Sequence, residues 1–206
     1  MTLTRPLWLG VYEVRQDEYE RVIGENPSKV KDGANPVTNV SRHAAVGFCR
    51  RLSDVAEEKK AGRTYRLPTE AEWEFACRGG TTTAFAFGSS LGSIQANFNG
   101  ALPYGGAAAG PALGRPAAVG SYKPNPFGLY DMHGNVWEWT ADRYTANYPS
   151  GPVVDPQPAQ SDRVRVFRGG DFGTTGSECR SAHRLGKEAQ LSYAGVGFRV
   201  ACDVAR

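Results

Sequence analysis

The sequence predicts an α+β fold, in which a few helices precede a long irregular segment and several short strands. Helical periodicity is confined to the part of the chain before Gly80. Between Gly80 and Gly120 the composition turns to Gly, Ala, Ser and Pro with little periodicity, and β-rich runs resume beyond it. Helices and strands are thus separated along the chain, which argues against alternating βαβ units.

The first elements are a strand and a short helix. Trp8–Val14 is rich in residues that favour strands. Tyr19, Val22 and Ile23 follow at the spacing i, i+3 and i+4, which predicts a short helix. Gly24 is expected to end that helix.

Two further helices are predicted from their capping residues. Ser41 can N-cap a helix that ends in the solvated run Glu57–Lys60. The apolar stripe of this helix consists of Ala45, Phe48, Cys49, Leu52 and Val55. Thr69 and Glu72 form a capping box for the next helix, which Gly79 ends.

The last part of the chain predicts short strands. Val164–Arg168 alternates apolar and basic residues, and Gly169–Gly170 interrupts the alternation. Val196–Cys202 reads as a closing strand. We expect the first and last strands to pair. The segment from Gly80 to Gly120 is expected to be a long surface excursion, because strands resume after it.

Length and charge exclude several classes of protein. With 206 residues the chain is suited to one domain, spanning 1–206, and is short for two. The 24 Lys and Arg residues against 21 Asp and Glu give a net charge of +3 without a basic run, so nucleic acid is not expected as a partner. No apolar stretch approaches the roughly 18 residues of a membrane-spanning helix.

The compartment stays open. Thr4–Gly10 already predicts a strand of the fold, and no signal peptide is visible. A cytoplasmic location is weakly favoured unless a leader has been removed. Whether Met1 is the natural start is undecided, as is the oligomeric state.

The most informative stretch is Asn125–Trp139, which holds two turn signals, two carboxylates and two tryptophans. Asp131 and Glu138 flank a turn that can direct backbone carbonyls inward, and hard cations prefer such oxygen ligands. The stretch therefore predicts a cation-binding loop that leads into a buried strand. Alternatively, Asp131 caps the turn and Glu138 pairs with a basic residue such as Arg168.

Several stretches together resemble the sulfatase-modifying-factor, or formylglycine-generating-enzyme, family. They are Tyr12–Val14, Gly24–Ser28, Asn35–Val40, Arg66–Glu74, Asn125–Trp139, Arg168–Gly170 and Gly197–Arg199. Their order and rough spacing match across Leu7–Cys202. The resemblance implies a C-type lectin-like α+β fold with two main helices, mixed short strands and much irregular loop. The family's usual first strand, upstream of Thr4, is expected to be missing.

The resemblance also implies structural calcium (Ca2+). The positions that match one calcium site of the family are Asp131, the carbonyls of Gly134 and Val136, and Glu138. A second site of the family would begin at Asn97 with the carbonyl of Phe98, but the aspartate that should follow is absent from Leu102–Arg115. His133 is expected to be exposed or stacked rather than a metal ligand.

The cysteines bear on both stability and catalysis. The resemblance implies disulfides between Cys77 and Cys179 and between Cys49 and Cys202, and the alternative is four small buried thiols. Oxidases of the family hold copper(I) on two thiols five residues apart, and copper(I) selects sulfur over oxygen. Thr174 stands at the first of these positions. Counted without gaps, Cys179 falls on the second, but alignment on Arg180–Arg184 places it on the family's structural cysteine, and we prefer this alignment because it keeps Gly197–Arg199 in register. In either case at most one thiol of the pair exists. The chain is expected to lack catalytic residues.

The C-terminal segment 164–199 resembles the variable proteins of diversity-generating retroelements. It keeps the frame of non-catalytic relatives but carries varied residues where those relatives have asparagine. This implies a ligand-binding surface on exposed loops, with a protein or small molecule as partner. The expected binding residues are Asp171, Phe172, Gly173, Thr174, Thr175, Ser177, Glu178, His183, Leu185, Lys187, Glu188, Leu191, Tyr193 and Ala194. Departures at Ala189, Gln190 and Ser192 favour simple drift instead.

Three functions stay open at this point. The first is a non-catalytic ligand- or protein-binding domain, and the second is a copper-dependent oxidase that modifies a protein cysteine. The third is an accessory domain cut from a larger chain. A Ser/His/Asp hydrolase is disfavoured, because neither His43 nor His183 lies in a recognisable nucleophile motif.

Overall fold

The helices precede most of the strands, as the α+β prediction requires. The computed structural model describes residues 2–148, 150–156 and 163–204, so Met1 lies outside the described residues. The described helices are α1 (Gln16–Ile23), α2 (Arg42–Ser53), α3 (Ala56–Lys60) and α4 (Glu70–Arg78). The described strands are β1 (Trp8–Leu9), β2 (Arg63–Arg66), β3 (Trp137–Arg143), β4 (Val164–Arg168), β5 (Leu185–Glu188), β6 (Val196–Gly197) and β7 (Ala201–Val204).

The predicted helix caps are confirmed. Gly24 ends α1 in the left-handed region at φ 94°, which a glycine adopts without steric cost. The Ser41 side chain accepts a hydrogen bond from the backbone of Ala44 at the start of α2. Thr69 and Glu72 form both halves of the capping box of α4. Among the described residues no helix is long and apolar enough to cross a bilayer.

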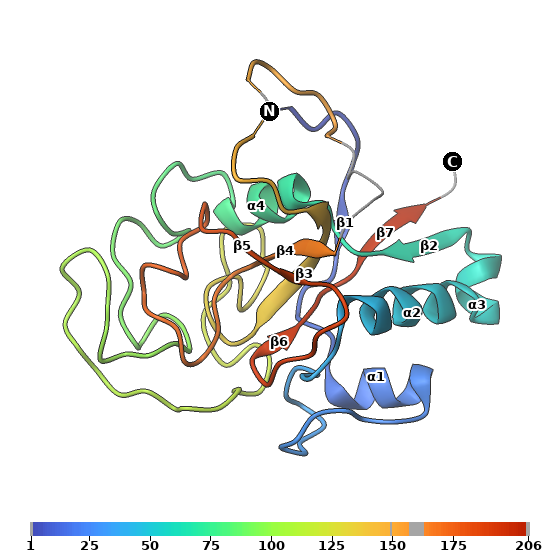
Figure 1. The fold of residues 1–206 in the computed structure, drawn as a ribbon, viewed down its shortest axis with the longest axis horizontal. Coiled ribbons are helices and arrows are strands. Elements are labelled where there is room, and N and C mark those ends of the chain that lie inside the picture. The colour runs from blue at the N-terminus through green and yellow to red at the C-terminus, as the bar shows by residue number, and fades with distance from the viewer. Residues whose placement is uncertain (1, 149, 157–162, 205–206) are drawn as a thin grey trace.

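The strands form two small sheets, with the orders β1-β7-β2 and β5-β4-β3-β6. Trp8 pairs with Cys202 in antiparallel register, so the predicted pairing of the first and last strands is confirmed. In Figure 1, α1 to α3 lie on one side of the sheets and the irregular loops fill the other side.

Several details differ from the prediction. Val196–Cys202 is not one strand, because β6 and β7 belong to different sheets. The backbone between them instead binds the start of the fold, where Val14 donates to the carbonyl of Phe198 at 2.9 Å. The strands β2 and β5 were not anticipated. Val55 lies beyond α2 and N-caps α3.

The excursion from Gly80 to Gly120 has no helix or named strand, as predicted, but it is more than a surface loop. It builds its own apolar cluster, in which Phe85, Leu91 and Phe98 are buried together with Cys179. The main core lies elsewhere, between α1, α2 and the sheet of β3. This second cluster fixes the loops that surround the candidate site.

Candidate functional site

Thr174 and Cys179 lie side by side in the segment after β4. The Thr174 Oγ1 atom is 3.6 Å from the Cys179 Sγ atom. The same hydroxyl donates to the carbonyl of Asp171 at 2.9 Å. A Cβ at Gly170 would lie 2.6 Å from the Cys179 sulfur, so only glycine allows this close packing. A hydroxyl at position 174 therefore faces the thiol of Cys179.

Cys179 is poorly suited to act as a nucleophile or soft metal ligand. Its side chain is fully buried, and burial raises the pKa of the thiol to about 12. The thiolate is the form that binds copper(I) and attacks electrophiles, and it is scarce at neutral pH for such a pKa. With one protonated thiol and one hydroxyl, these two residues do not fit copper(I).

Cys77 and Cys179 contact the same histidine without forming a disulfide. The Cys77 sulfur is 3.8 Å from both ring nitrogens of His133, and the His133 Nδ1 atom is 2.8 Å from the Cys179 carbonyl oxygen. All four cysteines are free thiols in this structure. The implied Cys77–Cys179 bond is absent, because the Cys77 sulfur is directed to His133 and the Cys179 sulfur to Thr174.

His133 is neither exposed nor stacked face to face: it is buried and meets two aromatic rings in an edge-to-face arrangement. Its ring lies 5.4 Å from the rings of Phe85 and Phe87. Nε2 accepts a hydrogen bond from the backbone of Ala86, which assigns the ring proton to Nδ1. Burial lowers the pKa of His133 to about 4, so the ring is neutral and structural.

The implied disulfide between Cys49 and Cys202 is likewise absent. Cys49 belongs to α2 and is buried in the main core. The Cys202 sulfur is half-buried and lies 3.5 Å from the carbonyl of Asp203. The two sulfurs thus have different surroundings in this structure.

Glu138 is paired with Arg199, whereas Arg168 was the predicted partner. Arg199 donates to both of its carboxylate oxygens at 2.7 Å, and the indole of Trp73 donates to one of them at 2.8 Å. The register of the sheet sets Glu138 opposite Arg168, but the side chains of these two residues have other partners. The basic-residue interpretation was right in kind and wrong about the partner.

Glu13 is a second residue that the sequence analysis missed. Its carboxylate accepts hydrogen bonds from the Asn135 side chain at 2.7 Å and from the Val136 backbone at 3.2 Å. Burial, with Asp131 and Glu138 nearby, raises the pKa of Glu13 well above its ordinary value. Glu13 and Arg199 both belong to the short stretches that carried the family resemblance, which is the signal that locates them.

Asp131 contributes to the same buried cluster. Its carboxylate accepts from the Gly120 backbone at 2.7 Å, and burial raises its pKa to about 6. Glu13, Asp131 and Glu138 together face one buried cation, Arg199. Since Arg199 and Trp73 already engage Glu138, the set of Asp131, Gly134, Val136 and Glu138 does not fit calcium in this arrangement.

The second predicted calcium position lies next to the first. The Asn97 carbonyl accepts from the Asn135 backbone at 2.7 Å, and a Cβ at Gly134 would lie 2.3 Å from that carbonyl oxygen. The Asn97 side-chain oxygen is buried without a hydrogen-bond partner among the described residues. Phe98 is buried beside it. An unpartnered amide oxygen supplies one ligand of the kind that a hard cation takes, so calcium at this position stays a prediction.

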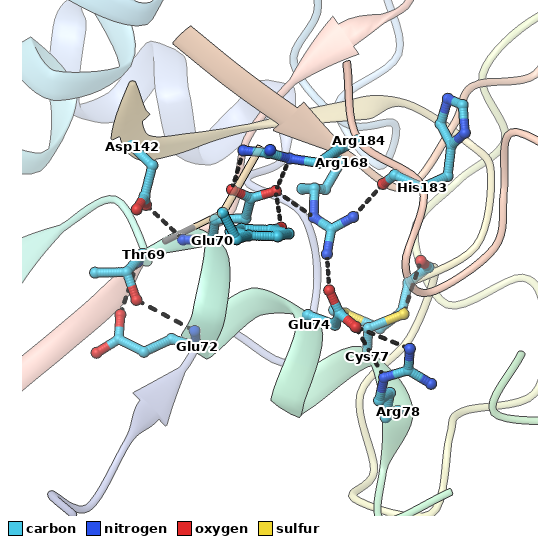
Figure 2. A network of polar contacts seen from close by, with 12 residues as sticks. Thr69, Glu70, Glu72, Glu74, Cys77, Arg78, Asp142, Arg168, His183 and Arg184 are labelled. Carbon is cyan, nitrogen blue, oxygen red and sulfur yellow. Dashed lines mark hydrogen bonds and ion pairs between the residues drawn. The ribbon is translucent and has the colours of Figure 1, made fainter. Parts of the chain in front are cut away.

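A buried network of ion pairs joins α4 to the C-terminal segment (Figure 2). Arg168 lies between Glu70 and Glu74, and it also donates to the carbonyl of His183. Arg184 binds both carboxylate oxygens of Glu70 at 2.7 and 2.8 Å. Burial lowers the pKa of His183. The backbone carbonyl of His183 is thus held by this network, whereas its ring is half-buried and Nε2 has no hydrogen-bond partner among the described residues.

The two predicted binding segments meet at one point and then diverge. A Cβ at Gly195 would lie 2.0 Å from Oδ2 of Asp171, so the segments touch there. Residues 171–178 pack on the excursion, where the backbone of Asn99 donates to the Thr174 carbonyl. Figure 1 shows the two loops next to each other. Residues 189–194 pack on the start of α2 instead, where Asn39 donates to the Tyr193 carbonyl.

The predicted binding residues differ in exposure. Those that are exposed are Gly173, Lys187, Leu191 and Ala194. Those that are half-buried are Asp171, Phe172, Thr174, Thr175, Ser177, Glu178, His183, Leu185, Glu188 and Tyr193. Lys187 lies over the Tyr193 ring, 5.5 Å from its centroid. The solvent-facing part is thus concentrated on β5 and the loop after it.

Known structures share this fold. Treponema denticola variable protein 1 covers 95% of this chain and 84% of its own, with a TM-score of 0.77 and 26% identity. PvdO from Pseudomonas aeruginosa covers 99% of this chain and 83% of its own, with a TM-score of 0.81 and 27% identity. The P3c variant of the major tropism determinant, at 19% identity and a TM-score of 0.53, covers 96% of this chain and 50% of its own and shares the fold alone.

Sequence comparison gives the family. The formylglycine-generating enzyme of Mus musculus is 34% identical over 206 residues, which cover 96% of this chain and 51% of that enzyme. The inactive C-alpha-formylglycine-generating enzyme 2 of Mus musculus is 34% identical over 179 residues, which cover 83% of this chain and 50% of that protein. The chain spans about half the length of these relatives. The model of the sulfatase-modifying factor enzyme 1-like domain matches residues 1–204, and the chain belongs to that family.

Proposed function

We propose that this chain is a non-catalytic domain that binds a protein or small-molecule ligand through its C-terminal segment. The observation that carries the proposal is the contact of the Thr174 hydroxyl with the Cys179 thiol at 3.6 Å. The family resemblance implies that an oxidase holds copper(I) on two thiols, the first of them at the position of Thr174, and a hydroxyl is no substitute for a thiolate toward this soft ion. A family member described as inactive, at 34% identity, supports the view that the frame is used without oxidation.

The ligand surface is proposed to be residues 185–194, with 171–178 beside it. Leu191 is 41% exposed, and a large apolar side chain contributes most when a ligand removes it from water. The likeness to Treponema denticola variable protein 1 supports a diversified segment between residues 164 and 199. A reverse-transcriptase gene beside this one, with an adenine-bearing near-copy of the segment, is the expected genomic observation.

A copper-dependent oxidase is the second candidate, favoured by the 34% identity to a formylglycine-generating enzyme. It requires another soft donor near Cys179, and Cys77 is the thiol that shares His133 with it. The two candidates differ in whether the purified chain binds copper(I) tightly.

The test is a copper(I) titration of the wild-type chain against a chromogenic competitor, with oxygen uptake measured on a cysteine-containing peptide. The Cys77→Ser and Cys179→Ser variants are titrated alongside. We expect no stoichiometric binding and no oxygen uptake. Tight 1:1 binding that both serine variants abolish, together with peptide-dependent oxygen uptake, would overturn the proposal in favour of the oxidase.

A further inference from the structure

A cleft lies between helix α2 and the N-terminal arm, the segment that contains Leu3 and Leu7. No described residue of the C-terminal loops lines it. It encloses about 460 Å³. The arm residues Leu3 and Leu7 form one wall, and α2 and Tyr65 of β2 form another. Sites for small organic molecules have volumes of roughly 300–1,000 Å³, so this cleft is large enough for one.

The wall formed by α2 has an apolar centre and a cation at each end. Arg42, Val46, Cys49 and Arg50 line the cleft. Their spacing of four, three and one residues places them on one face of the helix. Val46 is half-buried and lies between Arg42 and Arg50 on this face of the helix.

Arg42 is fixed in place without being neutralised. Its Nε and Nη2 atoms donate to the carbonyls of Thr140 and Ala141 at 3.1 and 3.0 Å. Those carbonyls orient the group but carry no full negative charge. Burial and the neighbouring Arg165 lower the pKa of Arg42 to about 10, and the nearby carboxylate of Asp142 offsets only part of this lowering.

The carboxylates of the cleft have other partners. Glu72 and Asp203 both bind Arg66, at 2.7 and 2.8 Å. Asp155 accepts a hydrogen bond from the backbone of Thr4 at 2.7 Å. Within the residues that the structure describes, neither Arg42 nor Arg50 forms an ion pair. The cleft thus presents positive charge that its own acids leave uncompensated.

We propose that this cleft binds a small amphiphilic organic anion. Its carboxylate or sulfonate group contacts one of the two guanidinium groups, that of Arg42 or that of Arg50, residues that lie about 12 Å apart along the helix, and its apolar body packs on Val46, Leu3 and Leu7. Guanidinium groups bind planar oxyanions through paired hydrogen bonds, which suits a carboxylate. An inorganic anion would leave the apolar walls in contact with water, so the apolar body is part of the proposed ligand.

The test uses two fluorescent probes that differ in one charged group. These are 8-anilinonaphthalene-1-sulfonate and its uncharged counterpart N-phenyl-1-naphthylamine, each titrated into the folded chain and displaced with dodecanoate. The Arg42→Gln, Arg50→Gln double variant is expected to weaken binding of the sulfonate about tenfold and to leave the neutral probe unchanged, because only the charged contact is lost. The Val46→Trp variant, which fills the cleft, is expected to abolish binding of both probes.

Two control variants distinguish this cleft from the surfaces beside it. Arg51→Gln removes a cation of α2 that donates to the Ile23 carbonyl and does not line the cleft. The affinity of this variant for the sulfonate probe should therefore match that of the wild type. Phe127→Ala alters the neighbouring apolar groove formed by Trp8, Phe75 and Phe127. Each variant is first shown to be folded by its thermal transition. The proposal would be overturned if Phe127→Ala abolished binding of the sulfonate while Val46→Trp preserved it. It would also be overturned if the double variant bound the sulfonate as tightly as the wild type.

Discussion

Arg199 donates to both carboxylate oxygens of Glu138 at 2.7 Å, in a pair that is fully buried. The same guanidinium donates to the carbonyls of Gly10 at 3.0 Å and Tyr130 at 2.9 Å. The Arg199 side chain thus joins three parts of the chain, which are the segment after β1 at Gly10, the loop before β3 at Tyr130, and β3 at Glu138. Removing it leaves the buried carboxylate of Glu138 without its cation, although Trp73 still donates to it, and takes a donor from two carbonyls.

Arg199→Ala is therefore expected to destabilise the chain by about 3–5 kcal/mol, the usual cost of breaking a buried ion pair on one side. Urea denaturation followed by tryptophan fluorescence measures the change. The matched control is Arg163→Ala, which breaks the exposed pair with Glu188 and should cost about 0–1 kcal/mol. Equal effects of the two substitutions would contradict the role assigned to Arg199.

Glu13→Gln is expected to remove a pH dependence of stability. Burial raises the pKa of Glu13 above its ordinary value of 4.5, so the folded chain keeps a proton that the unfolded chain loses. Stability is therefore lost as pH rises from 4.5 through the raised pKa of the folded state. Glutamine is uncharged at every pH and abolishes this loss.

Urea midpoints between pH 6 and pH 9 are the measurement for Glu13. The pKa of Asp131 is raised to about 6, so this range lies largely above its titration. The wild-type midpoint should fall across the range, and that of Glu13→Gln should change less. Glu25→Gln, at an exposed position, should follow the wild type. Parallel curves for all three chains would show that Glu13 is ionised in the folded state.

Local signals in the sequence predicted the helices well. Ser41, Gly24 and the Thr69–Glu72 box act through hydrogen bonds and backbone angles within a few residues, so they can be found from the sequence alone. The division of Val196–Cys202 into β6 and β7 was missed, because it depends on which sheet each half joins. That choice is made by residues far away in the chain.

The sequence predicted some of the acidic residues of the candidate site, but not the residues with which they form hydrogen bonds and ion pairs. Asp131 and Glu138 were recognised as acids beside a turn, and both are buried. The contacts of this motif reach both ends of the chain, since Arg199, which binds Glu138, lies 61 residues beyond it, and Glu13, which binds Asn135, lies 122 residues before it. Spacing within one motif carries no information on such contacts.

Calcium is expected to stabilise the chain through Asn97 rather than through Glu138. The Asn97 side-chain oxygen has no partner among the described residues, whereas Arg199 holds Glu138. Addition of calcium after chelation should raise the melting temperature, by about 2–4 °C for each kcal/mol of binding. Asn97→Ser should abolish the rise and Asp131→Asn should keep it. If the calcium-dependent rise in melting temperature were lost in Asp131→Asn and kept in Asn97→Ser, calcium would bind at the site of Asp131, Gly134, Val136 and Glu138 instead.

The C-terminal surface is expected to tolerate substitution only where it is exposed. Changes at Leu191 and Ala194 should alter stability by about 0.5 kcal/mol or less, as at most surface positions. Gly195→Ala should be strongly destabilising, because its Cβ would lie 2.0 Å from Oδ2 of Asp171. Thermal melts of the three variants compare these positions. A tolerated Gly195→Ala would mean that Asp171 moves freely.

Thr174→Cys is expected to create the thiol pair that the wild-type chain lacks. The Thr174 Oγ1 atom is 3.6 Å from the Cys179 Sγ atom, so a sulfur at position 174 would lie beside the existing one. Two adjacent thiols lose a proton more readily when a soft cation binds both, which offsets the burial that raises the pKa of Cys179 to about 12. The variant should therefore bind one copper(I) ion that the wild type does not bind.

The titration that tests Thr174→Cys uses the same competitor as the wild-type chain, with Thr174→Ser as the matched control. The serine variant keeps a hydroxyl and should behave as the wild type. The Cys77→Ser substitution, added to Thr174→Cys, shows whether the third buried thiol takes part. If Thr174→Cys bound no more copper(I) than Thr174→Ser while remaining folded, the single hydroxyl would not be what separates this chain from the oxidases of its family.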